Sequence, residues 1–188
     1  MPMTINGSGT ITGLSAGGLP DATITQAELA TGVAGTGPAF SAYTSIDQTF
    51  SASTYTVTNF QTEEFDTGGC FNNTASTTTL NGLSAPAYSF TPNVAGYYLI
   101  VGASYFNNSL VGEIAIYVYK NGAIYKTISD SAGTTGSYNY QNAGSVLVYL
   151  NGTGDYVQIY TWQTAGSYNH NNVASYTSYF QATLIRGA

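Results

Sequence analysis

Residues 114–128 run IAIYVYKNGAIYKTI, and this stretch decides the fold class. Two runs of β-branched and aromatic residues flank Asn121-Gly122, a pair that readily adopts the positive φ angles of a tight type I′ turn. The pattern predicts a β-hairpin with strands at 114–119 and 123–128. No helix of ordinary length is predicted anywhere after residue 38.

The length of this turn sets the register of the hairpin. If the turn has two residues, partners across the two strands have a constant sum of positions. This predicts that Tyr119 pairs with Ile124 and that Val118 pairs with Tyr125. Aromatic and β-branched partners of this kind stabilise a sheet.

The chain from Ala39 onward repeats this pattern of short β-branched and aromatic runs between clusters of Gly, Asn, Asp and Ser. The pattern is typical of an all-β domain. The expected strands are 39–44, 54–58, 62–65, 87–91, 96–106, 113–119, 123–129, 145–150, 156–162 and 179–185.

Alternation within the strands predicts which side chains are buried, because successive residues of a strand point to opposite faces. The residues expected to face the core are Phe180, Ala182, Leu184, Val157 and Ile159. Gln158 and Tyr160 are expected to face the other way.

Residues 97–103, YYLIVGA, are apolar or aromatic on both faces of the predicted strand. Such a strand needs cover on two sides, and we expect the opposing sheet to cover one side and a second subunit the other. The residues expected at this subunit interface are Tyr98, Ile100, Tyr160 and Tyr179.

Composition excludes several classes of function. Charged residues make up 6% of the 188 residues, well below the roughly 25% usual in soluble domains. A net charge of −6 with only three basic residues offers no attraction for nucleic acid or anionic lipid. No apolar run approaches the roughly 20 residues that a membrane-spanning helix needs, so no membrane insertion is expected.

The chain changes character near Pro38. Residues 1–37 are rich in Gly, Thr, Ala and Ser and contain no aromatic residue, so this segment is not expected to fold alone. We interpret it as an extended attachment arm or neck, with a disordered tail as the alternative. Residues 38–188 are expected to form the head domain. The first residues lack the basic start and apolar core of a secretion signal, and synthesis in the cytoplasm is expected.

Six short motifs follow one another in the head domain. They are PAFSA at 38–42, FDT at 65–67, the segment 90–98 with Gly96-Tyr97, KNG at 120–122, GSVLVYL at 144–150 with GDYV at 154–157, and SYFQATL at 178–184. In this order they resemble the globular head of complement component 1q and its relatives in the tumour necrosis factor superfamily. The resemblance covers about residues 38–186.

The resemblance implies a ten-stranded jelly-roll sandwich of two packed sheets that forms a homotrimer about a threefold axis. The sequence departs from the family because no collagen-like Gly-x-y tract precedes the domain and Ala182 replaces a usual Gly. A role in animal complement or as a cytokine is therefore not expected. Segments of the arm, such as residues 11–20, are similar in style to the linkers of bacteriophage fibre and virion-surface proteins.

These features lead to two hypotheses about function. The first is a structural virion protein, a tail-fibre tip or capsid fibre, made in the host cytoplasm and exposed at the particle surface for host attachment. The alternative is a capsid decoration or cement protein that stabilises the shell. In both, residues 1–37 bind capsid or tail proteins and the head binds copies of itself.

The sequence offers no catalytic constellation. His170 is the single histidine and has no acid or nucleophile at a diagnostic spacing. Glu63 and Glu64 are adjacent, so on a strand they point to opposite faces and cannot act as a pair of carboxylates. An enzyme such as a small glycan hydrolase is therefore not predicted.

Neither a cofactor nor a metal site is predicted. Asp66, Asp130 and Asp155 have oxygen atoms suited to calcium, but no loop contains a repeat rich in such ligands. Calcium is left open as an alternative. Cys70 is the only cysteine, so a disulfide within the chain is excluded.

Aromatic side chains in predicted loops and strand ends form the candidate binding site. Aromatic rings stack on the C–H faces of sugars, and neighbouring amides bond sugar hydroxyls. We expect them to face a host glycan or receptor, with packing inside the protein as the alternative. The candidate residues are Tyr138, Tyr140, Trp162, Tyr168, His170 and Tyr176.

Overall fold

The computed structural model of the chain describes residues 37–106, 112–133, 140–164, 167–170 and 177–188; of residues 167–170 it describes only the backbone. The expected arm lies outside these ranges except for Gly37, and so do Tyr138 and Tyr176. No helix in these ranges has the length and apolar character needed to cross a bilayer.

The described part of the chain is built from strands. They are β1 Ala39–Tyr43, β2 Gln48–Ser51, β3 Thr56–Val57, β4 Thr62–Asp66, β5 Thr78–Leu80, β6 Leu83–Ala85, β7 Gly96–Phe106, β8 Gly112–Lys120, β9 Ala123–Gly133, β10 Tyr140–Leu150, β11 Val157–Gln163, β12 Ser167–His170 and β13 Tyr179–Gly187. Most expected strands are present. The expected strand 87–91 is not formed, because Tyr88 has a φ of 52° and breaks the extended run, and only Phe90 keeps bridges to Phe71 and Val157.

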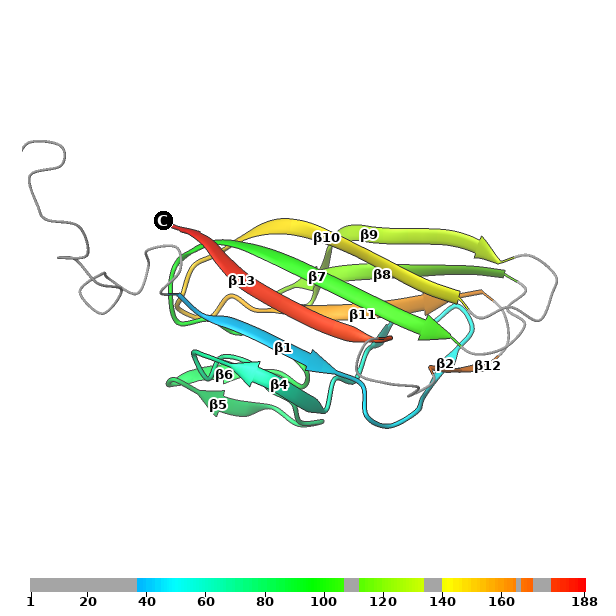
Figure 1. Cartoon of the computed structure of the whole chain (residues 1–188), viewed down its shortest axis with the longest axis horizontal. Helices are drawn as coiled ribbons and strands as arrows, with labels where there is room; N and C mark the ends of the chain where they lie inside the picture. The colour runs from blue at the N-terminus through cyan, green and yellow to red at the C-terminus, as the bar shows by residue number, and fades with distance from the viewer. Residues whose placement is uncertain (1–36, 107–111, 134–139, 165–166, 171–176) are drawn as a thin grey trace, which may run out of the picture.

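The strands form two main antiparallel sheets (Figure 1). One sheet has seven strands in the order β2-β12-β7-β13-β1-β4, and β10 pairs along the other edge of β7. The second sheet has four strands in the order β3-β11-β8-β9, while β5 and β6 make a small separate hairpin. This arrangement is a jelly-roll sandwich, as predicted.

Phenylalanine rings fill the space between the two sheets. The ring of Phe40 lies 4.3 Å from Phe71, 4.9 Å from Phe90 and 4.8 Å from Phe180, measured between centroids. These distances are typical of favourable aromatic pairs. The predicted core residues are confirmed, because Phe180, Ala182, Leu184, Val157 and Ile159 are all buried.

The predicted hairpin joins β8 to β9. Asn121 and Gly122 have φ angles of 52° and 79°, as a type I′ turn requires, and Tyr119 pairs with Ile124 as predicted. The predicted pairing of Val118 with Tyr125 is wrong. A β-bulge next to the turn inserts an extra residue, so that Val118 pairs with Lys126.

The two sheets come closest along β9 and β10. A Cβ atom added to Gly144 would lie 1.9 Å from the carbonyl oxygen of Ile128, so only glycine fits there. Asn142 bridges the same edge, since its Nδ2 donates to the carbonyl of Ile114 and its Oδ1 accepts from the hydroxyl of Ser131. One long edge of the sandwich is thus closed by direct contacts between the sheets.

Candidate binding surfaces

The outer side of the seven-stranded sheet carries a band of apolar side chains, which we call the apolar face. Its members are Tyr97, Leu99, Val101, Leu147, Tyr149 and Ile185. Tyr97, Leu147, Tyr149 and Ile185 are between 41% and 56% exposed. The register places Leu147 beside Leu99 and Tyr149 beside Tyr97, whose rings lie 5.5 Å apart, so the band is continuous across β7 and β10.

The structure corrects the expected orientation of Tyr98 and Ile100. Both side chains have no exposed surface within a single protomer and belong to the core between the sheets, where the hydroxyl of Tyr98 donates to the carbonyl of Val94. Burial raises the pKa of Tyr98. The outward residues of the same strand are Tyr97 and Leu99. Tyr179, half-buried in β13 opposite Ala103, stays a predicted interface residue.

The outer side of the four-stranded sheet carries a cluster of aromatic rings, which we call the aromatic platform. Its members are Tyr55, Tyr117, Tyr119, Tyr160 and Trp162. Alternation places them on one side, because their strand neighbours Ile116, Val118 and Ile159 face the core.

Rings of the platform contact one another across strands. Tyr119 and Tyr160 stack with centroids 3.8 Å apart, and Tyr55 lies 5.2 Å from Tyr117 and 6.1 Å from Trp162. Tyr55 is 44% exposed, whereas Tyr117, Tyr160 and Trp162 are half-buried. Tyr119 is buried beside Tyr160, whereas the other four rings are held in place by a neighbour while part of their surface faces solvent.

Polar groups border the platform at the β8–β9 side. The register places Thr127 beside Tyr117, and Asp130 beside Ala115, which in turn pairs with Trp162. Burial is the main reason why the pKa of Tyr117 rises to about 12, and the hydrogen bond with Tyr55 and the negative charges of Asp130 and Glu113 add to it. The Tyr117 hydroxyl therefore stays protonated at neutral pH.

The structure separates the predicted loop residues. Trp162 belongs to the platform, together with Tyr160, which had been expected at the subunit interface. Tyr140 is half-buried against the cluster of Phe50, Phe106 and Ile114, so its ring serves packing. Tyr168 and His170 lie in β12, where their side chains are not described, and Tyr138 and Tyr176 fall outside the described residues.

Sequence analysis missed Tyr55, Tyr117 and Tyr119 as members of a surface cluster. Tyr117 and Tyr119 stand two positions apart in the first strand of the predicted hairpin, so alternation alone indicates that they share a face. Tyr55 comes from a distant part of the sequence. Only the pairing of β3 with β11, in which Val57 lies opposite Tyr160, brings it to the same surface.

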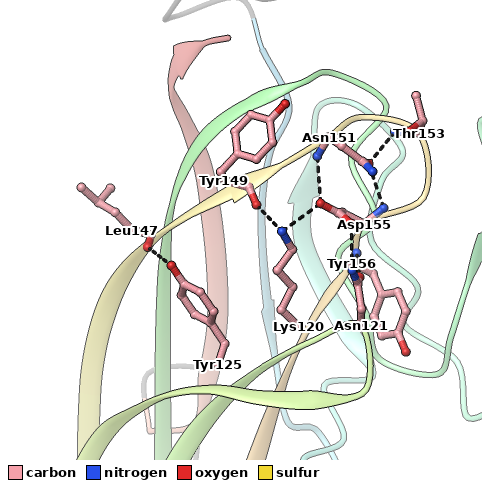
Figure 2. A network of polar contacts seen from close by, with 9 residues as sticks. All are labelled: Lys120, Asn121, Tyr125, Leu147, Tyr149, Asn151, Thr153, Asp155 and Tyr156. Carbon is pink, nitrogen blue, oxygen red and sulfur yellow. Dashed lines mark hydrogen bonds and ion pairs between the residues drawn. The ribbon is translucent and has the colours of Figure 1, made fainter.

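A polar network joins the β8–β9 turn to the loop between β10 and β11 (Figure 2). The ammonium of Lys120 lies 2.9 Å from Oδ2 of Asp155 and donates to the carbonyl of Tyr149. Nδ2 of Asn121 donates to Oδ1 of Asp155, and Oδ1 of Asn121 accepts from the backbone N–H of Tyr156. The KNG and GDYV motifs are therefore in direct contact.

The charge of Asp155 is stabilised by this network. Burial on its own would raise the pKa of Asp155, but hydrogen bonds from Asn121, Lys120 and the backbone of Asn151, with the charge of Lys120, lower it overall. Its oxygen atoms are occupied by protein donors, so the network holds two loops together rather than presenting a ligand site.

Two other acidic residues considered from the sequence, Glu64 and Asp66, also have structural partners. Glu64 accepts a 2.6 Å hydrogen bond from the hydroxyl of Ser41, and Asp66 accepts from the backbone N–H groups of Gly68 and Phe71. Within residues 37–106, 112–133, 140–164 and 177–188, no three His, Cys, Asp or Glu side chains gather as metal ligands. Asp66, Asp130 and Asp155 thus do not share a site.

Comparison with known proteins identifies the fold. No protein-family model and no curated protein matches the sequence. Among solved structures, the globular domain of zebrafish complement 1qA is 17% identical, with 80% of this chain and 99% of that chain covered and a TM-score of 0.52. Murine APRIL is 9% identical, with 79% of this chain and 98% of the APRIL chain covered and a TM-score of 0.53.

A third similar structure is Eiger TNF from S. frugiperda, with 15% identity, coverage of 80% of this chain and 92% of that chain, and a TM-score of 0.50. At such identities the likeness concerns the path of the backbone and not the surface residues. The chain has the jelly-roll fold of complement 1q globular domains and tumour necrosis factor-like proteins.

Proposed function

We propose that this chain is a non-enzymatic attachment protein at the surface of a bacteriophage particle. In this proposal the jelly-roll head forms a homotrimer, and residues 1–37 anchor it as a tail-fibre tip or capsid fibre. The observation that carries the proposal is the apolar face, because it is a surface suited to contact with further copies of the chain.

The apolar face supports self-association. Large contiguous apolar patches are rare on monomeric proteins and usually mark contact surfaces. Here Leu147 and Ile185 are 56% and 46% exposed, and they lie on the same side of the sheet as the exposed rings of Tyr97 and Tyr149. The sequence resemblance to complement 1q heads supports threefold symmetry, in which one such surface is used by every subunit.

A non-enzymatic role is supported by how the acidic groups are used. Glu64, Asp66 and Asp155 each hold a neighbouring strand or loop through short hydrogen bonds. The exposed surfaces instead present rings and aliphatic groups, which suit binding rather than proton transfer.

Light scattering on the purified full-length chain tests self-association. The monomer has a mass of 19.7 kDa, and we expect the measured mass to be about three times larger at micromolar concentration. A monomer under these conditions would remove the basis of the proposal.

The location on a virion is tested separately with antibody against the head. Particles labelled at tail or fibre tips would support attachment to the host. Label over the whole shell would instead favour the alternative, a capsid decoration protein that binds shell subunits. Particles that carry none of the chain would contradict both roles and leave the trimer measurement unaffected.

A further inference from the structure

We propose that the aromatic platform is a carbohydrate-binding surface that takes the ring faces of a neutral oligosaccharide. This inference deepens the attachment role proposed above and rests on it only for its biological purpose. The binding surface itself lies on the outer side of the four-stranded sheet, away from the apolar face.

Stacked and partly exposed rings are the first reason. The C–H faces of a pyranose ring pack against aromatic faces, and they do so best where the rings are already held in position. Tyr55 and Trp162 are stacked at an interplanar angle of 28°, and the partly exposed Tyr160 stacks at 18° on the buried ring of Tyr119. The platform thus offers ordered aromatic faces that lose little side-chain freedom on binding.

Hydrogen-bonding groups around the rings are the second reason. A sugar presents hydroxyls that donate and accept, and the platform offers phenol hydroxyls, the hydroxyl of Thr127 and the carboxylates of Glu113 and Asp130. Among the described side chains, none donates a hydrogen bond to the Asp130 carboxylate. Sugar hydroxyls are suitable donors to such a carboxylate.

The charges on this surface select against acidic sugars. Glu113 and Asp130 both face Tyr117 closely enough to affect its ionisation. None of the three basic residues balances them: Lys120 is bound to Asp155, Arg186 lies in β13 of the other sheet, and the ammonium of Lys126 lies over the ring of Tyr125. A carboxylate-bearing sugar would therefore be repelled.

The same charges argue against a second copy of the chain as the occupant. Covering the platform with protein would bury Glu113 and Asp130, and buried carboxylates need cationic or donor partners. A chain with nine acidic and three basic residues has few cations to supply. The members of the apolar face include Leu147 and Ile185 and no carboxylate.

Trp162 provides a direct test because it is the only tryptophan in the chain. Its fluorescence is measured while the full-length protein is titrated with a neutral N-acetylglucosamine tetramer, a neutral glucose tetramer and a sialylated trisaccharide. We expect at least one neutral tetramer to cause a saturable change in emission at micromolar to millimolar concentration. The sialylated sugar is expected to cause none.

Matched variants connect the change to the platform. Tyr55→Ala removes an exposed ring and keeps the Trp162 reporter, and we expect binding to weaken about tenfold. Tyr125→Ala is the matched control, because Tyr125 lies in β9 outside the platform and is 38% exposed, close to the 44% of Tyr55. This variant is expected to bind sugar like the wild type. Thermal melting of both variants establishes that they are folded.

Three results would overturn the inference. The first is that no neutral sugar changes the emission of Trp162 at millimolar concentration. The second is that Tyr55→Ala and Tyr125→Ala weaken sugar binding equally. The third is that the emission changes with the concentration of the protein but not with that of the sugar. The last result would identify a second copy as the occupant. Light scattering of the same samples separates the proposals, since a trimer without sugar binding contradicts only this inference, and a sugar-binding monomer contradicts only the trimer.

Discussion

The two outer surfaces of this sandwich differ in chemistry although both are built on regular antiparallel sheet. The apolar face combines tyrosines with Leu147 and Ile185, whereas the aromatic platform combines rings with the carboxylates of Glu113 and Asp130. Leu147 and Ile185 have no polar atoms in their side chains, so covering them with another protein surface is favourable. Rings with carboxylates beside them retain a need for hydrogen-bond donors.

The comparison teaches that exposed aromatic residues alone do not distinguish an interface from a ligand site. Tyr97 and Tyr149 form a ring pair at 5.5 Å on the apolar face, much like the pairs in the platform. The residues around the rings make the difference. On this basis we expect assembly and sugar binding to respond to different substitutions.

Placing a charge on each surface in turn is expected to have the largest effect. Leu147→Asp should convert the trimer to a monomer, because each interface would have to bury a carboxylate at a cost of several kcal/mol. Tyr55→Asp makes the same kind of change on the platform and should leave the mass unchanged. Both are measured by light scattering, and a monomer for Tyr55→Asp alone would reverse the assignment of the two surfaces.

Neighbouring residues of β13 provide the next contrast. Leu184 is 5% exposed and packs in the core, whereas Ile185 is 46% exposed. Leu184→Ala should lower the free energy of unfolding by about 2–5 kcal/mol because it leaves a cavity. Ile185→Ala should change it by less than about 0.5 kcal/mol.

This contrast is best measured by denaturant unfolding in the Leu147→Asp background, so that loss of assembly does not contribute. Equal effects of the two substitutions would contradict the assignment of Leu184 to the core and Ile185 to the surface.

The smallest effect is expected at the network that joins the β8–β9 turn to the β10–β11 loop. The pKa of Asp155 is lowered in the folded state, so its charge stabilises the fold above the unfolded pKa of about 3.9. That contribution is lost as the pH falls through the lower folded pKa. Asp155→Asn should therefore cost about 1 kcal/mol at pH 7 and almost nothing at the most acidic pH at which the protein stays folded.

Unfolding of Asp155→Asn and of the wild type is compared at several pH values. A difference that grows toward acidic pH would contradict the assigned role of the Lys120–Asp155 pair. Lys126→Met serves as the control, because the ammonium of Lys126 contacts a ring and not a carboxylate.

Much of the fold could be predicted because its determinants are local. Asn121-Gly122 specifies the turn, and alternation identifies Phe180, Ala182 and Leu184 as core residues. The bulge beside Val118 was not predicted, because the Asn-Gly pair indicates the turn but not where the strands beside it change register. The short strand β12 was missed because its four residues carry no periodic pattern long enough to recognise.

The candidate site was predicted only in part. Trp162 was identified as a binding residue and does lie in a partly exposed cluster, but Tyr98 was assigned to a surface and is buried. Residues 97–103 are apolar on both sides, and periodicity cannot tell which side of such a strand meets the opposing sheet. Pairing of β7 with β13 and β10 settles this, with Tyr98 between Leu184 and Val148.

The sequence by itself determined the class of fold, the central hairpin and the alternation of buried side chains, since each depends on residues close together in the chain. Only the tertiary structure decided which aromatic residues share a surface and which charges accompany them. The pairing of β3 with β11 brings Tyr55 to Trp162, and the register of β8 with β9 and β11 places Asp130 and Trp162 on either side of Ala115. Contacts between distant strands depend on register, and register is a property of the whole sheet.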